Sequence, residues 1–235
     1  MPAVLTSISP MPALIRFILL YAAMYGAFGV ASPFMPAFLN ARGLQPEHLG
    51  FVLGAGTAVR LLTSPVAGRI GDLLQALRLV LVVFITLSAA ATAAYLGVYG
   101  FWMLSAVYLL HAAALAPITI LADALAVGPA SSPRRKKFEY GWVRGTGSAV
   151  FIAGTLLSGQ AVGAFGLGAI VVLQASLLGA AAVAALLIPE LIHDRTSSAA
   201  RAPAGGVRLL FRQPRFRNLV FVAALILGSH AMHDA

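Results

Sequence analysis

The chain has 235 residues, of which 60% are hydrophobic and only 10% are charged. A typical globular protein is about 25% charged, so this composition excludes an ordinary soluble domain and indicates a membrane protein. The sequence contains no cysteine, which excludes disulfides, thiolate metal ligands and cysteine nucleophiles. Lys and Arg outnumber Asp and Glu by 16 to 7. In a membrane protein such an excess marks the cytoplasmic side of the bilayer.

Six segments are apolar and long enough to cross a bilayer, because about 20 apolar residues span the hydrocarbon core as a helix. We expect these helices at residues 13–39, 48–67, 79–98, 101–127, 143–164 and 167–189. Pro33 and Pro36 are expected to kink the first of them. A seventh apolar segment starts at Asn218, and the sequence ends at Ala235 before it can cross.

The predicted fold is therefore an all-α membrane protein in three parts. Residues 1–190 are expected to form a six-helix transmembrane lobe, residues 191–217 a basic cytoplasmic linker, and residues 218–235 a truncated seventh helix. This layout is typical of one half of a two-lobed transporter, so we interpret the chain as a fragment.

The distribution of basic residues predicts the orientation. With the N-terminus in the cytoplasm, 14 of the 16 Lys and Arg residues fall on the inner side, and only Arg42 falls outside. We therefore expect a multi-pass protein of the inner membrane with a cytoplasmic N-terminus. The basic run at 134–137 is interpreted as an anchor beside anionic lipid rather than as a nucleic-acid site.

Ionisable side chains at membrane depth are candidates for function, because burying them in hydrocarbon is costly. Arg60 lies 12 residues before Asp72, roughly 18 Å along a helix from the inner turn. We expect Arg60 to line a substrate path, with a structural hydrogen bond to carbonyls as the alternative. Tyr21 and Tyr25 lie on one helical face of the first span and are expected either to stack on substrate or to pack.

Asp123 and Arg144 lie at the inner ends of consecutive spans, so we expect them to form a charge pair. Such a pair either stabilises the lobe or changes partner during transport. His111 lies in the middle of the fourth span, where a proton relay and a packing hydrogen bond are both open interpretations.

The turn after the second span resembles the signature between helices two and three of the major facilitator superfamily. Gly68, Asp72 and Arg78 match its pattern, whereas Leu73, Gln75, Ala76 and Leu77 stand where the family usually has Arg, Gly and two basic residues. The resemblance implies that the three matching residues gate the inner side of the transporter.

A second block runs from Asp123-Ala124-Leu125 to Tyr140-Gly141-Trp142-Val143-Arg144 and Gly147-Ser148. It resembles the phenylpropionate permease branch of the superfamily, related to lactose permease and the nucleoside/proton symporters. Gly228-Ser229-His230-Ala231 is similar to the branch's entry into helix seven. The resemblance implies proton-coupled symport of a small organic solute, such as an aromatic acid, with His230 facing the cavity.

The expected partners are a small solute, protons, the lipid bilayer and a missing C-terminal lobe, or a second copy of the chain if the truncation is genuine. We expect no enzymatic activity, no cofactor, no metal site and no nucleic-acid binding. The alternative function is that of a half-transporter that does not transport and serves only as a structural or dimerising membrane protein.

Overall fold

The computed structural model describes residues 12–131, 138–188 and 212–233, which form helices joined by short turns. The contacts divide the chain into two units, Met1–Glu190 and Leu191–Ala235, and each is described by itself. The helices of the first unit are α1 (Ala13–Ala31), α2 (Met35–Ala41), α3 (Pro46–Leu74), α4 (Leu77–Ala94), α5 (Phe101–Ser131), α6 (Tyr140–Phe165) and α7 (Gly168–Leu186). The second unit contains α9 (Pro214–His233).

The expectation of an all-α membrane protein is confirmed, because six of these helices (α1 and α3 to α7) are long and apolar enough to cross a membrane. Their bounds differ from the predicted ones mainly in the first span, which is interrupted rather than only kinked. α1 ends at Ala31, residues 32–34 form a turn, and Pro36 lies in the first turn of α2. Proline lacks an N–H donor and is favoured at such helix starts, which explains the break. Pro214 likewise starts α9 before the expected Asn218.

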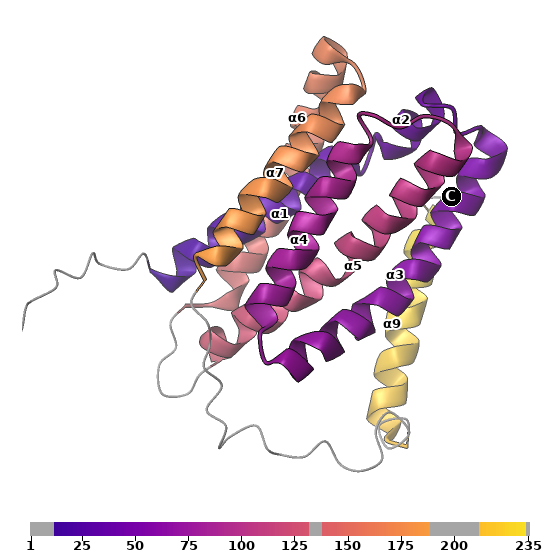
Figure 1. Ribbon diagram of the computed structural model, residues 1–235. Helices are drawn as coiled ribbons and strands as arrows, with labels where there is room; N and C mark the ends of the chain where they lie inside the picture. Colours follow the sequence, from indigo (N-terminus) through magenta and orange to yellow (C-terminus); the bar gives the residue numbers. More distant parts are fainter. Residues whose placement is uncertain (1–11, 132–137, 189–211, 234–235) are drawn as a thin grey trace, which may run out of the picture. The chain divides into compact units, whose positions relative to one another are not determined.

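The first unit consists of two groups of three helices. α1 packs against both α6 and α7, while α5 packs against both α3 and α4. Contacts between α4 and α7 join the two groups, as can be followed in Figure 1. Two apolar cores result, one around Tyr21 and the beginning of α1, the other around Tyr95 at the end of the bundle that carries α2. We refer to the latter as the α2 end.

α1 and α6 approach closely because glycines face each other across their contact. A Cβ atom on Gly154 would lie 2.9 Å from the carbonyl oxygen of Gly26, and one on Gly29 would collide with the backbone of Phe151. At the same place the Thr155 hydroxyl donates to the carbonyl oxygen of Gly29 at 3.1 Å. Small residues and cross-helix hydrogen bonds of this kind stabilise helix pairs within a bilayer.

Arg42, the basic residue expected outside, closes the α2 end. Its guanidinium donates to the carbonyl oxygen of Leu96 at 3.2 Å and lies 4.4 Å from the ring centre of Tyr99 and 5.1 Å from that of Phe38. The backbone N–H of Gly100 donates to the Arg42 carbonyl oxygen at 3.2 Å. Arg42 thus fastens the loop after α2 to the turn between α4 and α5.

α3 and α6 have much larger exposed faces than their neighbours. In the most apolar stretch of each of these two helices only 11% of the residues are buried, whereas the other four spans bury 33% to 44% of theirs. Large apolar side chains cover these faces, with Leu61 of α3 72% exposed and Leu156 of α6 69% exposed. Lipid or further protein must therefore cover these faces.

Replacing Gly154 by alanine should destabilise the lobe by about 1–3 kcal/mol, because a methyl group there overlaps the α1 backbone. Gly54 is the matched control, since nothing lies within 4 Å of its Cβ position and Gly54→Ala should be neutral or stabilising through helix propensity. Thermal unfolding of both variants in detergent measures the difference. Equal unfolding temperatures would contradict the close α1–α6 contact.

Candidate functional site

Asp123 of α5 is the centre of a hydrogen-bonded cluster. Its Oδ1 atom accepts hydrogen bonds from the hydroxyl of Tyr21 on α1 at 2.5 Å and from the hydroxyl of Tyr140 on α6 at 2.7 Å. Hydrogen bonds to an ionised acceptor contribute about 1.5–3 kcal/mol each. Asp123 thus ties α1, α5 and α6 together where α6 begins.

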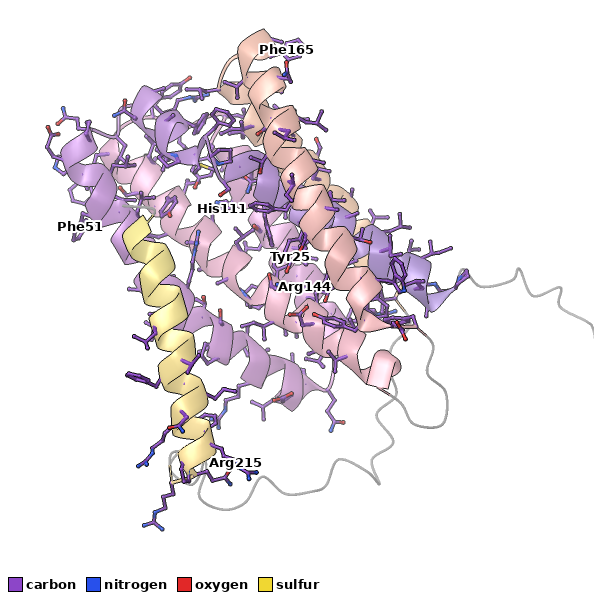
Figure 2. All side chains as sticks on the ribbon, turned by 180° about the vertical axis from the view of Figure 1, so that it is seen from behind. Tyr25, Phe51, His111, Arg144, Phe165 and Arg215 are labelled. Atoms are coloured by element: carbon purple, nitrogen blue, oxygen red, sulfur yellow. The ribbon has the colours of Figure 1, made fainter. Side chains whose placement is uncertain are left out.

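Arg144 lies one helical turn after Tyr140 on α6. Its guanidinium donates to the hydroxyl of Tyr25, and its Cζ atom lies 5.0 Å from the centre of the Tyr25 ring. Figure 2 shows these two side chains next to each other. The Tyr25 ring in turn stacks on Tyr21, with ring centres 5.8 Å apart and an angle of 21° between the planes.

The structure therefore differs from the expected direct pairing of Asp123 with Arg144. In the described part of the chain the two residues are connected through tyrosines: Asp123 binds Tyr21, Tyr21 stacks on Tyr25, and Tyr25 binds Arg144. The physical reason is that the face of α1 carrying both tyrosines lies against α6, so that neutral hydroxyls reach each charged group. We call these residues, together with Tyr140, the tyrosine network.

The local sequence explains how Tyr25 reaches Arg144. Gly147, three residues after Arg144 on α6, lies under the ring of Tyr25, and a Cβ atom there would be 2.9 Å from a ring carbon. Phe28, one turn further along α1, packs edge-on against Tyr25 with ring centres 5.5 Å apart. The three aromatic residues of α1 therefore form the shared face that their spacing predicts.

Arg60 lies on α3 with its side chain exposed. Among the residues that the structure describes, it makes no side-chain hydrogen bond or ion pair. An exposed cation at this depth is costly unless it faces a polar path or an anion.

His111 is buried at a second polar cluster, which joins α5, α7 and the turn that follows α4. Its Nδ1 atom lies 3.4 Å from the Tyr95 hydroxyl, and its Nε2 atom lies 3.5 Å from the side-chain nitrogen of Gln174. Gln174 is completely buried, and its Oε1 atom makes no hydrogen bond. In Figure 2 His111 lies further toward the α2 end of the bundle than Arg144.

The sequence alone does not identify the partners in the two clusters. Tyr140 stands out in it only as part of a motif, although it lies one turn before Arg144. Gln174 is not among the predicted residues, although a glutamine within an apolar span is a polar group that needs a partner at membrane depth. Tyr95 and Tyr108 carried no signal, because aromatic residues in a span usually pack.

The three residues of the expected gating motif lie around the turn between α3 and α4. Gly68 has open space at its Cβ position, and Asp72 is exposed. The Arg78 guanidinium donates to the carbonyl oxygen of Ile188 at 2.9 Å, which fastens this turn to the end of α7. Gln75 closes α3 in the left-handed conformation, with φ at 49°.

Two groups of predicted residues lie outside the described part. The side chain of His230 on α9 is one, and the basic run at 134–137 is the other. Within the described residues no group of three His, Asp or Glu side chains is close enough to hold a metal ion.

Comparison with known proteins identifies the family. The MFS_1 like family matches residues 14–235, which is nearly the whole chain. The chain belongs to this family. The resemblance to the major facilitator superfamily is thereby confirmed.

A curated member is similar over most of the chain. The probable 3-phenylpropionic acid transporter of Escherichia coli (strain K12) is 28% identical over 219 residues, which cover 91% of this chain and 55% of that protein. The chain therefore spans about half the length of this curated relative. No solved structure matches the chain.

Replacing Tyr140 by phenylalanine should destabilise the lobe by about 1–3 kcal/mol, because it removes one of two donors to a partly buried carboxylate. Tyr99 is a suitable control, since its exposed ring is kept in Tyr99→Phe and no hydrogen bond of its hydroxyl is described. Thermal unfolding at neutral pH compares the two variants. If Tyr140→Phe unfolds at the temperature of the control, the tyrosine network does not stabilise the lobe.

Replacing Gln75 by glycine should stabilise the lobe by about 1 kcal/mol, because glycine adopts the left-handed conformation without the steric cost of a Cβ atom. Glycine at the neighbouring Leu74, the last residue of α3, should instead destabilise the lobe by about 0.5–1 kcal/mol. The two variants can be compared by their unfolding temperatures. A loss of stability in Gln75→Gly would show that the turn does not take this conformation.

Proposed function

We propose that this six-helix lobe is one half of a secondary active transporter, which moves a small organic anion by alternating access together with protons. The observation that carries the proposal is that Arg60 and Arg144, both within spans, have no carboxylate partner among the described residues. Uncompensated cations at membrane depth are retained where they face a polar path. The family and the named relative support the same class of function.

The proposed substrate is an aromatic carboxylic acid. Arg60 is the proposed anchor for the carboxylate, and the aromatic face of Tyr21 and Tyr25 is the proposed contact for the ring. The support is chemical, because Arg binds carboxylates by paired hydrogen bonds and aromatic rings stack on one another. The curated relative is named as a transporter of such an acid, 3-phenylpropionic acid. His230 is proposed to contribute from the seventh helix.

Asp123 and Arg144 are proposed to couple proton movement to the conformational change. Each is now held by tyrosine hydroxyls, which are weaker partners than an opposite charge. A shift of α6 along α1 would exchange these partners and bring the two charges into direct contact. Gly68, Asp72 and Arg78 are proposed to gate the inner side through the turn between α3 and α4.

A second lobe is proposed to cover α3 and α6, whose apolar faces are the least buried in the bundle. The named relative is nearly twice as long as the segment that matches this chain, so a protein of that length can contain a second lobe. The proposed location is the inner membrane with the N-terminus in the cytoplasm, which the excess of basic residues on that side supports.

Uptake of radiolabelled 3-phenylpropionate into cells or vesicles that carry the natural protein tests the proposal. Arg60→Ala should reduce uptake by about tenfold or more, because a carboxylate loses its charged partner, and Arg60→Lys should retain part of it. Arg69→Ala is the control, since Arg69 is an exposed arginine on the same helix. Normal uptake by Arg60→Ala would overturn the assignment of Arg60.

A cross-linking experiment distinguishes two possible partners of α6, a second lobe of the same protein and a second copy of this chain. The sequence has no cysteine, so Leu156→Cys on α6 places a single thiol on an exposed apolar face. If a second copy covers α6, this variant forms disulfide-linked dimers in membranes. Val183→Cys on α7, which is 60% exposed, is the control. Absence of dimers in both variants favours a covering lobe within one chain and disfavours a dimer of half-transporters.

A further inference from the structure

The exposed aromatic side chains of the first unit gather at the ends of its helices. Among the described residues of this unit, five Phe, Tyr or Trp side chains are exposed, and each lies in a turn or among the first or last six residues of a helix. Towards the helix centres the exposed large side chains are Leu, Ile and Val. The five aromatic residues are Phe51, Tyr99, Trp102, Trp142 and Phe165.

This distribution matches the two headgroup layers of a bilayer. Trp and Tyr are enriched in these layers because each combines an apolar ring with a polar N–H or O–H group. Trp142 and Phe165 lie at the two ends of α6, 23 residues apart, which is about 34 Å along a helix. The hydrocarbon core of a bilayer is about 30 Å thick, so the two rings bracket it.

Four of the five aromatic residues lie at the α2 end, and they come from both groups of helices. The residues next to them in sequence pack into the core around Tyr95, and Figure 2 shows Phe51 and Phe165 on the side of His111 away from Arg144. α3 and α5 belong to one group of helices and α6 to the other. A bilayer surrounds the bundle and reaches all of these positions, whereas a protein partner on one face reaches only some of them.

Trp102 is held in place by its neighbours, although its side chain is 82% exposed. It packs edge-on against Phe101, with ring centres 4.9 Å apart, and Phe101 packs against the imidazole of His48 at 5.0 Å. Tyr99, three residues earlier, is 65% exposed. The beginning of α5 therefore presents two exposed rings that each carry a polar group.

Arg42 adds a positive charge beside these rings. Its guanidinium lies 4.4 Å from the centre of the Tyr99 ring and donates one hydrogen bond, to the carbonyl oxygen of Leu96. A guanidinium has five N–H donors, and Arg42 forms no ion pair within the described residues. Its remaining donors suit a phosphate group, which arginine binds by charge-assisted hydrogen bonds.

We infer that the α2 end is a contact surface for phospholipid headgroups, in which Tyr99 and Trp102 lie at headgroup depth and Arg42 binds a lipid phosphate. This contact fixes the depth of the turn between α4 and α5 in the membrane. The inference does not depend on the proposed function, because any protein with these six spans meets both leaflets of a bilayer.

Fluorescence quenching of Trp102 tests the depth. The natural protein is reconstituted into vesicles of phosphatidylcholine and phosphatidylglycerol that carry a nitroxide either on the headgroup or at the middle of the acyl chain. The Trp102 signal is the difference between the unchanged protein and Trp102→Phe, which keeps an aromatic ring. The headgroup nitroxide should remove most of this signal, and the mid-chain nitroxide much less.

A tryptophan deeper in the same helix is the matched control. Leu110 of α5 is 46% exposed and lies eight residues after Trp102, about 12 Å further along the helix. In Leu110→Trp combined with Trp102→Phe, the mid-chain nitroxide should be the stronger quencher. Stronger quenching of Trp102 itself by the mid-chain nitroxide overturns the headgroup depth. Quenching of Trp102 only by aqueous iodide, or by no quencher at all, overturns the lipid contact, in the latter case in favour of a covering protein.

The role of Arg42 is tested by titrating the detergent-solubilised protein with phosphatidylglycerol while Trp102 fluorescence is followed. Arg42→Gln should weaken binding about fivefold, the contribution of one arginine near an anionic lipid surface. Arg42→Lys keeps the charge and should bind nearly as the unchanged protein does. Arg69→Gln, which removes an exposed arginine near the other end of α3, is the control and should not change the titration.

Two results would overturn the assignment of Arg42. In one, Arg42→Gln binds phosphatidylglycerol like the unchanged protein. In the other, Arg42→Lys loses as much binding as Arg42→Gln, which would show that the loss follows from the broken hydrogen bond to Leu96 rather than from the missing charge.

Discussion

The arrangement of the lobe depends on one carboxylate that accepts two tyrosine hydroxyls. Asp123 binds Tyr21 and Tyr140 through the same oxygen, and so connects helices that are separated by about a hundred residues in sequence. A carboxylate in an apolar bundle needs such donors, because its charge is otherwise too costly. The stacking of Tyr21 on Tyr25 and the contact of Tyr25 with Arg144 extend from this point.

The two polar clusters lie at different places in the bundle. The tyrosine network lies where α1, α5 and α6 meet, and the His111 cluster lies where α5, α7 and the turn after α4 meet. α5 belongs to both, with Asp123 twelve residues after His111. α5 therefore contributes a polar side chain to each cluster.

The sequence predicts the spans well and the side-chain partners poorly. Composition and hydropathy place the six helices, because apolar runs of 20 residues have no other stable arrangement in a bilayer. The break at residues 32–34 follows from two prolines. The partners of Asp123 depend on which helix faces contact each other. The order of the helices predicts only that Arg144, at the start of the next span, lies at a similar depth. Packing of α1 on α6 instead places tyrosines there, and a single sequence does not contain that long-range contact.

The contacts of α1 also bear on how the protein is made. α1 packs mainly against α6 and α7, which are synthesised more than a hundred residues later, so it must wait in the membrane without its final neighbours. Throughout that interval Tyr21 and Tyr25 lack Asp123 and Arg144, and the glycine surface of α1 stays open to lipid. Early spans of this kind are sites where insertion machinery or a membrane chaperone has time to act. Substitutions in α1 should therefore lower the yield of inserted protein more than their effect on the finished bundle suggests.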